Sequence, residues 1–191
     1  MEIVLIRHGQ SEANRIDKEV YKFLCGRFDC DLTEYGEKQA VALRNNPLLQ
    51  NADAIFCSPL KRTIQTAKLF SSQPIIIDDR IQERTMGEFD GKAVDEVKSN
   101  PIYSKYFSEP IYMNFRNSFI MKAPNGESYA DVEARVSDFL KEILSQNYNK
   151  VIIVSHAVAI RCLLKVILNL SEAETINLRI KQCEPILVSC D

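Results

Sequence analysis

The chain lacks a long apolar run, an excess of charge of either sign and more than two histidines. A membrane-spanning helix needs about 20 apolar residues, and the continuous apolar runs here are far shorter. The 24 basic and 26 acidic residues are spread along the chain, which excludes a nucleic-acid-binding stripe and a polybasic membrane patch. The amino terminus also enters an apolar strand pattern directly, without a basic and then apolar signal segment. We therefore expect a cytoplasmic protein that binds neither nucleic acid nor membranes.

No Cys-x-x-Cys pair occurs among the six cysteines, and two histidines are too few to complete a metal site with them. We therefore expect free thiols and no metal or other cofactor. Cys57 and Cys162 fall in apolar strand and helix patterns, where cysteine packs as a small hydrophobic residue. A disulfide between Cys25 and Cys30 is the alternative, and a reducing compartment disfavours it.

Length and periodicity predict one α/β domain over residues 1–191, because 46% hydrophobic residues suffice for one sizeable core. Short apolar runs alternate with helical patterns, which is typical of a mostly parallel central sheet with helices on both faces. The predicted strands are 3–6, 54–57, 75–77, 151–154 and 185–188. The predicted helices are 33–45, 60–70, 128–144 and 157–168.

Two segments lack this regularity. Residues 13–31 carry charges without clear periodicity, and we expect them to form a loop over the site. Residues 92–124 hold six aromatic residues separated by prolines, which predicts an insertion or lid that selects substrates. The alternative for these aromatic residues is a satellite cluster packed under a long loop.

Both histidines directly follow four-residue aliphatic strands: Arg7-His8 after 3–6 and Ser155-His156 after 151–154. Parallel strands end at the same edge of a sheet, which is where α/β proteins bind ligands. The helix expected after His156 would direct its free N–H groups to the same place. A third strand, 54–57, leads into Ser58-Pro59 and then Arg62, which brings a second arginine to this edge. These residues together predict an anion site.

Six ordered sequence blocks resemble the histidine phosphatase superfamily, also called the phosphoglycerate-mutase-like family. They are Arg7-His8-Gly9-Gln10-Ser11-Glu12 with Asn14, Asp31–Gly36 with Gln39-Ala40, Ser58–Thr63 with Thr66-Ala67, Glu83-Arg84 with Gly87 and Gly91, Gly126-Glu127-Ser128, and Val154-Ser155-His156. The resemblance covers nearly the whole chain and implies a three-layer phosphoglycerate-mutase-like sandwich.

The resemblance also implies roles for individual residues. His8 would be the nucleophile that accepts a phosphoryl group, and Glu83 would donate a proton to the leaving oxygen. Arg7, Arg62 and His156 would hold the phosphate, while Asn14 and the N–H of Ala157 would line the pocket. Phosphoryl transfer independently requires several convergent donors around the transferred group, which two arginines and an imidazolium would supply. Nearby cations should keep His8 neutral and nucleophilic.

Position 157 separates two branches of this family. The acid-phosphatase and phytase branch typically has an aspartate acid directly after the second histidine, and here that residue is Ala157. Glu83 is therefore the favoured acid, although Asp78, Asp79, Glu88 and Asp90 lie nearby in the sequence. Many relatives have glycine at this position, so Ala157 should narrow the pocket slightly.

Three classes of function remain open at this stage. We favour a phosphomonoesterase acting on a small phosphorylated metabolite, because Lys92–Asp95 does not resemble the longer insertion typical of glycolytic mutases. A mutase-type isomerase is the alternative, and a non-catalytic phospho-ligand binder is the third. Solvated surface residues are the favoured interpretation of the five basic residues of the variable segment, and binding of a second phosphate or carboxylate is the alternative: Lys92, Lys98, Lys105, Arg116 and Lys122. These patterns do not specify the oligomeric state.

Overall fold

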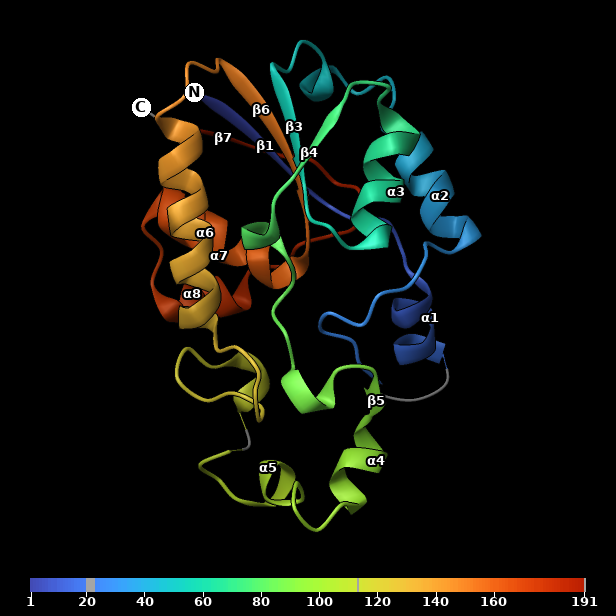
Figure 1. Cartoon of the computed structure of the whole chain (residues 1–191), viewed down its shortest axis with the longest axis vertical. Coiled ribbons are helices and arrows are strands. Elements are labelled where there is room, and N and C mark those ends of the chain that lie inside the picture. The colour runs from blue at the N-terminus through green and yellow to red at the C-terminus, as the bar shows by residue number, and fades with distance from the viewer. Residues whose placement is uncertain (20–22, 113, 191) are drawn as a thin grey trace.

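The computed structural model describes residues 1–19, 23–112 and 114–190. Its centre is a five-stranded sheet in the order β4-β3-β6-β1-β7 (Figure 1). The strands are β1 (Glu2–Arg7), β3 (Ala54–Cys57), β4 (Ile75–Ile77), β6 (Lys150–Ser155) and β7 (Ile186–Ser189). The first four run parallel, whereas β7 pairs antiparallel with β1. The predicted α/β fold with a mostly parallel sheet is confirmed.

Helices cover both faces of the sheet, because successive side chains of each strand point to opposite sides. Ile3 and Leu5 pack with α6 (Tyr129–Leu144) and α7 (Ala157–Leu168) on one face. Val4 and Ile6 pack on the other face, in a cluster that includes side chains of α3 (Lys61–Phe70). The helices α2 (Glu34–Val41) and α8 (Glu172–Asn177) complete the two outer layers (Figure 1).

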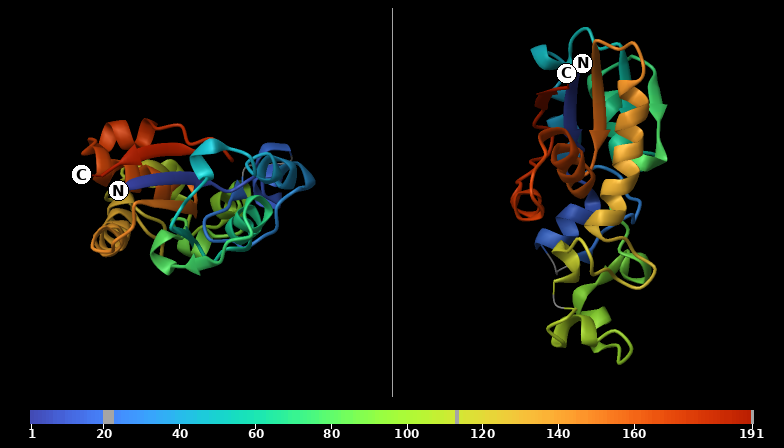
Figure 2. Two further views of the ribbon diagram at one scale, coloured as in Figure 1. Left: turned by 90° about the horizontal axis from the view of Figure 1, so that it is seen from above. Right: turned by 90° about the vertical axis from the view of Figure 1, so that its left-hand side faces the viewer.

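The two termini lie side by side (Figure 2), and the Met1 ammonium donates to the Cys190 carbonyl at 2.7 Å. All six cysteines are free thiols, as predicted, and Cys57 and Cys162 are buried in the core. No helix within the described ranges has both the length and the apolar character needed to cross a membrane.

The loop predicted for residues 13–31 is only partly correct. Residues Glu12–Glu19 form helix α1, and Phe23–Leu24 form the short strand β2, while residues 20–22 lie outside the described part. The helix begins after Ser11, whose hydroxyl accepts from the Asn14 N–H at 3.4 Å. An ion pair between Arg15 and Glu12 at 2.8 Å also stabilises it. Its few apolar positions explain why hydrophobic periodicity did not predict it.

Residues 85–112 and 114–124 form a lobe beyond the carboxyl ends of the parallel strands (Figures 1 and 2). The lobe contains β5 (Lys92–Ala93), α4 (Val94–Ser99) and α5 (Lys105–Ser108), and β5 pairs with β2. Short 3₁₀ turns occur in the lobe at Gly87–Phe89 and Phe115–Asn117. Two others lie outside it, at Pro47–Leu49 and Asp79–Ile81. Phe89 and Phe115 centre a separate hydrophobic cluster. Most of the aromatic residues of 92–124 therefore fold the lobe itself.

Candidate active site

The two histidines meet at the carboxyl edge of the sheet, as the sequence predicted. Arg7 is paired with Ser155 in the parallel register of β1 and β6, and the His8 N–H donates to the Ser155 carbonyl at 3.1 Å. The rings of His8 and His156 lie 5.1 Å apart between centroids and meet at 60°. Both side chains are almost completely buried.

His8 is held as a neutral imidazole with one defined free nitrogen. Its Nδ1 lies 2.7 Å from the Gly9 carbonyl oxygen, which can only accept, so Nδ1 carries the proton and Nε2 carries the lone pair. Burial, followed by the charges of Arg62 and Arg7, lowers the pKa of His8 well below its ordinary range. The expectation that the nearby cations keep His8 neutral is consistent with this direction.

Glycine is required at position 9 for close packing of the loop that follows β1. A Cβ on Gly9 would lie 2.5 Å from the carbonyl oxygen of Gly36, and a Cβ on Gly36 would lie 2.0 Å from the carbonyl oxygen of Gln10. The two backbones therefore touch directly, which fixes the loop that presents His8. The Gly9 N–H also donates to the Thr66 hydroxyl at 3.1 Å.

His156 is oriented by Ser58, which follows β3. The His156 Nε2 lies 2.8 Å from the Ser58 hydroxyl oxygen, and its buried Nδ1 has no partner. Burial and then the charges of Arg62, His8 and Arg7 lower the pKa of His156 well below its ordinary range. Burial, more than the neighbouring charges, thus disfavours the imidazolium form that was expected from the sequence for His156.

Arg7 and Arg62 converge on the same edge from different elements. Arg7 donates from one terminal nitrogen to the Ile180 carbonyl at 2.8 Å, and Arg62 donates to the carbonyls of Phe28 and Gly26 at 2.8 and 3.0 Å. Four buried side-chain nitrogens in the described part of the chain lack any hydrogen-bond partner: Arg7 Nε, Arg62 Nε, Arg84 Nε and His156 Nδ1. Three of these four belong to residues that the sequence assigned to phosphate binding.

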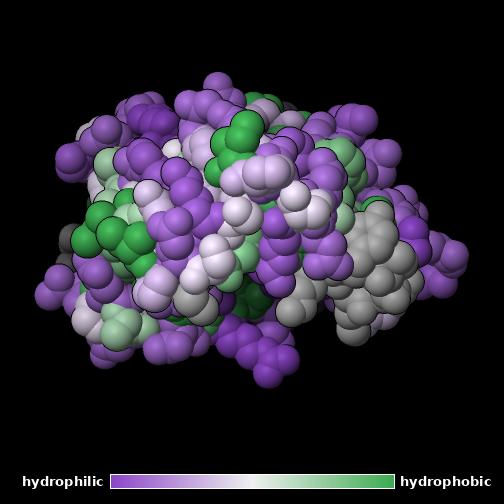
Figure 3. All heavy atoms as spheres, turned by 90° about the horizontal axis from the view of Figure 1, so that it is seen from below, coloured by the Kyte–Doolittle hydropathy of each residue, from purple (hydrophilic) through white to green (hydrophobic). Residues whose placement is uncertain are grey.

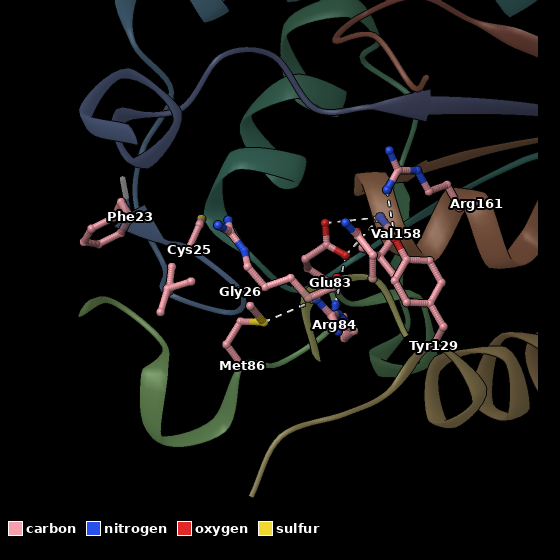
Figure 4. A pocket seen from close by; sticks show the side chains of 12 residues that line it. Phe23, Cys25, Gly26, Glu83, Arg84, Met86, Tyr129, Val158 and Arg161 are labelled. Atoms are coloured by element: carbon pink, nitrogen blue, oxygen red, sulfur yellow. Dashed lines mark hydrogen bonds between the residues drawn. The ribbon is translucent and has the colours of Figure 1, made fainter. Parts of the chain in front are cut away.

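Glu83 lies at the amino-terminal end of α7. The Glu83 Oε1 accepts from the Val158 N–H at 3.2 Å and from the N–H of the next residue in the chain, Arg84, at 2.9 Å. The free N–H groups and positive dipole end of a helix stabilise a carboxylate in this position. Glu83 also lines a cavity of about 340 Å³ (Figure 4).

The other four candidate carboxylates do not line this cavity. Asp78 forms an ion pair with Arg80, and Glu88 accepts from Tyr103 and Asn125. Asp90 accepts from three groups of the adjoining loops, and Asp79 accepts from Gln82. The geometry is therefore consistent with Glu83 as the acid among these five.

Asn14 and Ala157 lie at the same edge. The Asn14 Oδ1 accepts from the N–H and hydroxyl of Ser11 and from Gln182 at 3.2, 3.0 and 2.8 Å. Ala157 is the first residue of α7 and lines a second cavity, of about 430 Å³, together with Arg7. Arg161 lines both cavities.

The cavity that contains Glu83 is rich in arginine. Arg84, Arg116 and Arg161 line it, together with Tyr129 and Cys25 (Figure 4). Arg84 donates to the carbonyls of Phe115 and Arg116, and Arg161 donates to the Tyr129 hydroxyl at 2.8 Å. Burial raises the pKa of Cys25 to about 12, so this thiol is neutral and does not compete with His8 as a nucleophile.

Sequence reasoning assigned no role to Arg84, Arg161 and Tyr129. Arg161 lies one helical turn after Ala157 on α7, a spacing that places it near the same cavity and could have indicated it. Of the five basic residues considered in the variable segment, only Arg116 lines the cavity.

The four lysines of that segment contact other groups. Lys92 lies over Tyr103, Lys98 over Phe107, and Lys105 over Tyr106 and Tyr112. Lys122 forms an ion pair with Asp131 at 2.8 Å.

Known proteins resemble this chain in sequence and in fold. Residues 3–191 match the family described as "Histidine phosphatase superfamily (branch 1)". The chain is 34% identical over 169 residues to phosphoserine phosphatase 1 of Hydrogenobacter thermophilus, covering 85% of this chain and 74% of that protein. It is 29% identical over 198 residues to the 2,3-bisphosphoglycerate-dependent phosphoglycerate mutase of Bartonella bacilliformis, covering 97% of this chain and 90% of that protein. The crystal structure of the alpha-ribazole phosphatase from Shigella flexneri superposes with a TM-score of 0.82 at 25% identity, covering 100% of this chain and 91% of that one.

Proposed function

Because the chain belongs to the histidine phosphatase superfamily, branch 1, we propose that it hydrolyses phosphate monoesters of small metabolites through a phosphohistidine intermediate on His8. The relatives include a phosphoserine phosphatase and an alpha-ribazole phosphatase, which supports the predicted phosphatase activity on a small phosphorylated metabolite. The assignment of His8, Glu83, His156, Arg7 and Arg62 as catalytic residues, and of Asn14 and Ala157 as substrate-binding residues, is part of this proposal.

One observation carries the proposal: the unpartnered buried nitrogens of Arg7, Arg62 and His156 gather around a histidine whose own lone pair is free. A buried nitrogen donor without a partner is costly, on the order of 1–3 kcal/mol for each group. Groups of this kind are retained where a ligand satisfies them. A tetrahedral dianion provides enough oxygens to accept from all three while one face of the phosphorus stays open to Nε2.

The first chemical step follows from the orientation of His8. The Nε2 lone pair attacks the phosphorus in line with the leaving oxygen, the P–O bond breaks, and Glu83 donates its proton to that oxygen. The Nδ1–H that donates to the Gly9 carbonyl stays in place and supports the positive charge that develops on the ring. Arg7, Arg62 and His156 stabilise the charge on the equatorial oxygens.

The second step reverses these roles. Glu83, now ionised, takes a proton from water, the water oxygen attacks the phosphorus, and the N–P bond breaks to return neutral His8 and free phosphate. Every group that stabilises the charge of the transferred phosphoryl group in both steps belongs to this chain. The proposed mechanism therefore needs no metal.

We further propose that the substrate carries a second anionic group, which Arg116 and Arg161 would bind. In the cavity that Glu83 lines, these two side chains and Arg84 accompany the single carboxylate of Glu83, so positive charge dominates. The end of the molecule on which the lobe lies is predominantly hydrophilic (Figure 3), which suits a polar ligand. Within a single domain over residues 1–191, the segment 92–124, which carries Arg116, would then act as the selecting lid.

Phosphoglycerate mutase activity is the alternative, because the chain is also similar to a mutase over 97% of its length. A mutase must keep the phosphohistidine from water until the phosphate returns to an acceptor. A panel of phosphorylated hydroxy acids, amino acids and sugars, assayed for both released phosphate and isomerised product, distinguishes the two. We expect phosphate release. Isomerised product without release would assign the mutase reaction, and binding without turnover would assign a non-catalytic binder.

A further inference from the structure

The backbone of Glu83 is held by two arginines from distant parts of the chain. The Glu83 carbonyl oxygen accepts from the Arg27 Nε–H at 2.9 Å and from a terminal nitrogen of Arg135 at 3.1 Å. Arg27 lies between β2 and α2, and Arg135 lies on α6. Arg135 also donates to the carbonyls of Arg80 and Gln82, so it holds most of the segment that leads into Glu83.

Glu127 joins the two arginines. Its Oε1 lies 3.1 Å from Arg27 Nη2 and 3.0 Å from Arg135 Nε, and its Oε2 accepts from the same two guanidinium groups at 3.1 and 3.0 Å. The side chains of Glu127 and Arg135 are only 18% and 15% exposed, which limits screening by solvent. Burial alone would raise the pKa of Glu127. The hydrogen bonds and the charge of Arg135 outweigh this effect and hold the pKa below its ordinary value.

Glu127 also binds the backbone on the carboxyl side of Glu83. Its Oε2 accepts from the Thr85 N–H at 3.1 Å, and its own N–H donates to the Thr85 carbonyl at 3.0 Å. The Glu83 carboxylate is fixed separately by the amino-terminal end of α7. The Glu127 carboxylate therefore holds the backbone on both sides of Glu83, the residue that would protonate the leaving group.

We propose that Glu127, acting through Arg27 and Arg135, is the positioning residue for the general acid Glu83. This inference rests on the proposed function, because it assumes that Glu83 protonates the leaving oxygen. Side chains from two separate chain segments, Arg27 and Arg135, converge on one backbone carbonyl that has no part in the sheet or in any helix, and Glu127 from a third segment joins them. A general acid is effective only when its proton lies within hydrogen-bond reach of the leaving oxygen, so a small shift of this loop weakens that step first.

The test is the dependence of kcat/KM on the leaving group in a Glu127→Gln variant. In this variant an amide N–H₂ replaces one acceptor oxygen and faces donors of Arg27, Arg135 or Thr85, which disrupts the network at nearly constant volume. General acid catalysis contributes about 10²- to 10⁴-fold, and we expect the variant to lose about 10- to 100-fold on an alkyl phosphate. We expect less than about threefold loss on 2,4-dinitrophenyl phosphate, whose leaving group needs no proton.

Glu133→Gln provides the matched control. It breaks the 3.0 Å ion pair between Glu133, on the helix α6 that also carries Arg135, and Lys165 of α7, at 29% side-chain exposure of Glu133. In the described part of the chain, Glu133 forms no hydrogen bond or ion pair with residues 80–85. We expect this control variant to change kcat/KM only slightly, and by the same factor for both substrates. Arg27→Lys is the second variant, because it keeps the positive charge and removes the Nε donor to Glu83. The Arg27 side chain is 31% exposed, so a substitution there preserves folding more easily.

The outcomes separate this inference from the proposed function. Equal loss on both phosphate esters in Glu127→Gln and in Arg27→Lys would overturn the positioning role. Glu83→Gln is measured in parallel, and it should show the same selectivity with a larger loss. If Glu83→Gln shows selectivity and the two network variants do not, only the inference fails. If Glu83→Gln shows none, the assignment of the acid itself fails.

Discussion

The imidazole rings of His8 and His156 lie 5.1 Å apart, although the two residues stand near opposite ends of the chain. Each follows a parallel strand that ends at the same sheet edge, and the N–H of His8 donates to Ser155, the residue before His156. Burial, and then the charges of Arg62 and Arg7, lower the pKa values of both rings. Two imidazoles held in the neutral form therefore lie next to each other at the sheet edge that also carries the two arginines.

The lowered pKa values predict how stability changes with pH. In the unfolded chain both histidines titrate near the ordinary value of about 6.5, whereas in the folded protein they stay neutral well below it. The unfolded state therefore binds more protons below that pH, and the free energy of unfolding should fall as the pH decreases from about 6.5. Each histidine should contribute a slope of up to about 1.4 kcal/mol per pH unit.

Urea denaturation between pH 5 and pH 8 measures this slope. His8→Asn removes one titrating group and leaves the carboxylates unchanged, so the variant should lose stability less steeply on the acid side than the wild type. An unchanged slope would show that His8 does not have a lowered pKa in the folded protein.

Replacing Arg62 should be far more damaging than replacing its exposed neighbour Lys61. Arg62 is 1% exposed and has a free buried Nε, whereas the Lys61 side chain faces solvent. Hydrogen bonds to charged groups are worth about 1.5–3 kcal/mol, so Arg62→Ala should lower kcat/KM by about 10- to 150-fold. Lys61→Ala should stay within about twofold of the wild type, because an isolated surface charge contributes little. Comparable losses in the two variants would contradict the assigned role of Arg62.

Arg116 should matter only for substrates with a second negative charge. Arg116→Ala should raise KM for phosphoserine or 3-phosphoglycerate by about three- to tenfold and leave ethyl phosphate unchanged, because a partly solvated charge pair is worth on the order of 1 kcal/mol. Lys98→Ala is the matched control, since this lysine of the same segment lies over Phe107 and not in the cavity. An equal change of KM for substrates with and without a second negative group would exclude Arg116 as the residue that binds this group.

Removal of divalent metal should leave turnover unchanged. The donors that stabilise the transferred group in the proposed mechanism are guanidinium, imidazole and backbone N–H groups. We expect kcat and KM to be the same before and after dialysis against EDTA. A loss of activity that one added metal restores would exclude the proposed metal-free mechanism.

The central part of the site could be predicted because it depends on regular structure. Strands 3–6 and 151–154 have the continuous apolar pattern of buried parallel strands, and each ends at a histidine. The shared edge of a parallel sheet then brings His8 and His156 together whatever their separation in sequence. The position of Arg62 follows in the same way from the strand 54–57.

The surroundings of the site could not be predicted because they depend on tertiary contacts between irregular segments. Arg27, Glu127 and Arg135 are three charged residues with no periodic relation, and only the folded loops bring them to Glu83. The same holds for Gln182, which reaches Asn14 from the segment before β7. Helix α1 was missed because polar contacts, and not an apolar stripe, support it.

The most direct test of the central claim is detection of the phosphohistidine. The protein is mixed with a ³²P-labelled phosphate monoester, quenched within the first turnover at neutral and at acid pH, and mapped by mass spectrometry. We predict an acid-labile phosphoryl group on His8 that is absent from His8→Asn. Labelling of another residue, or labelling of His8→Asn at full strength, would contradict the claim that His8 is the nucleophile.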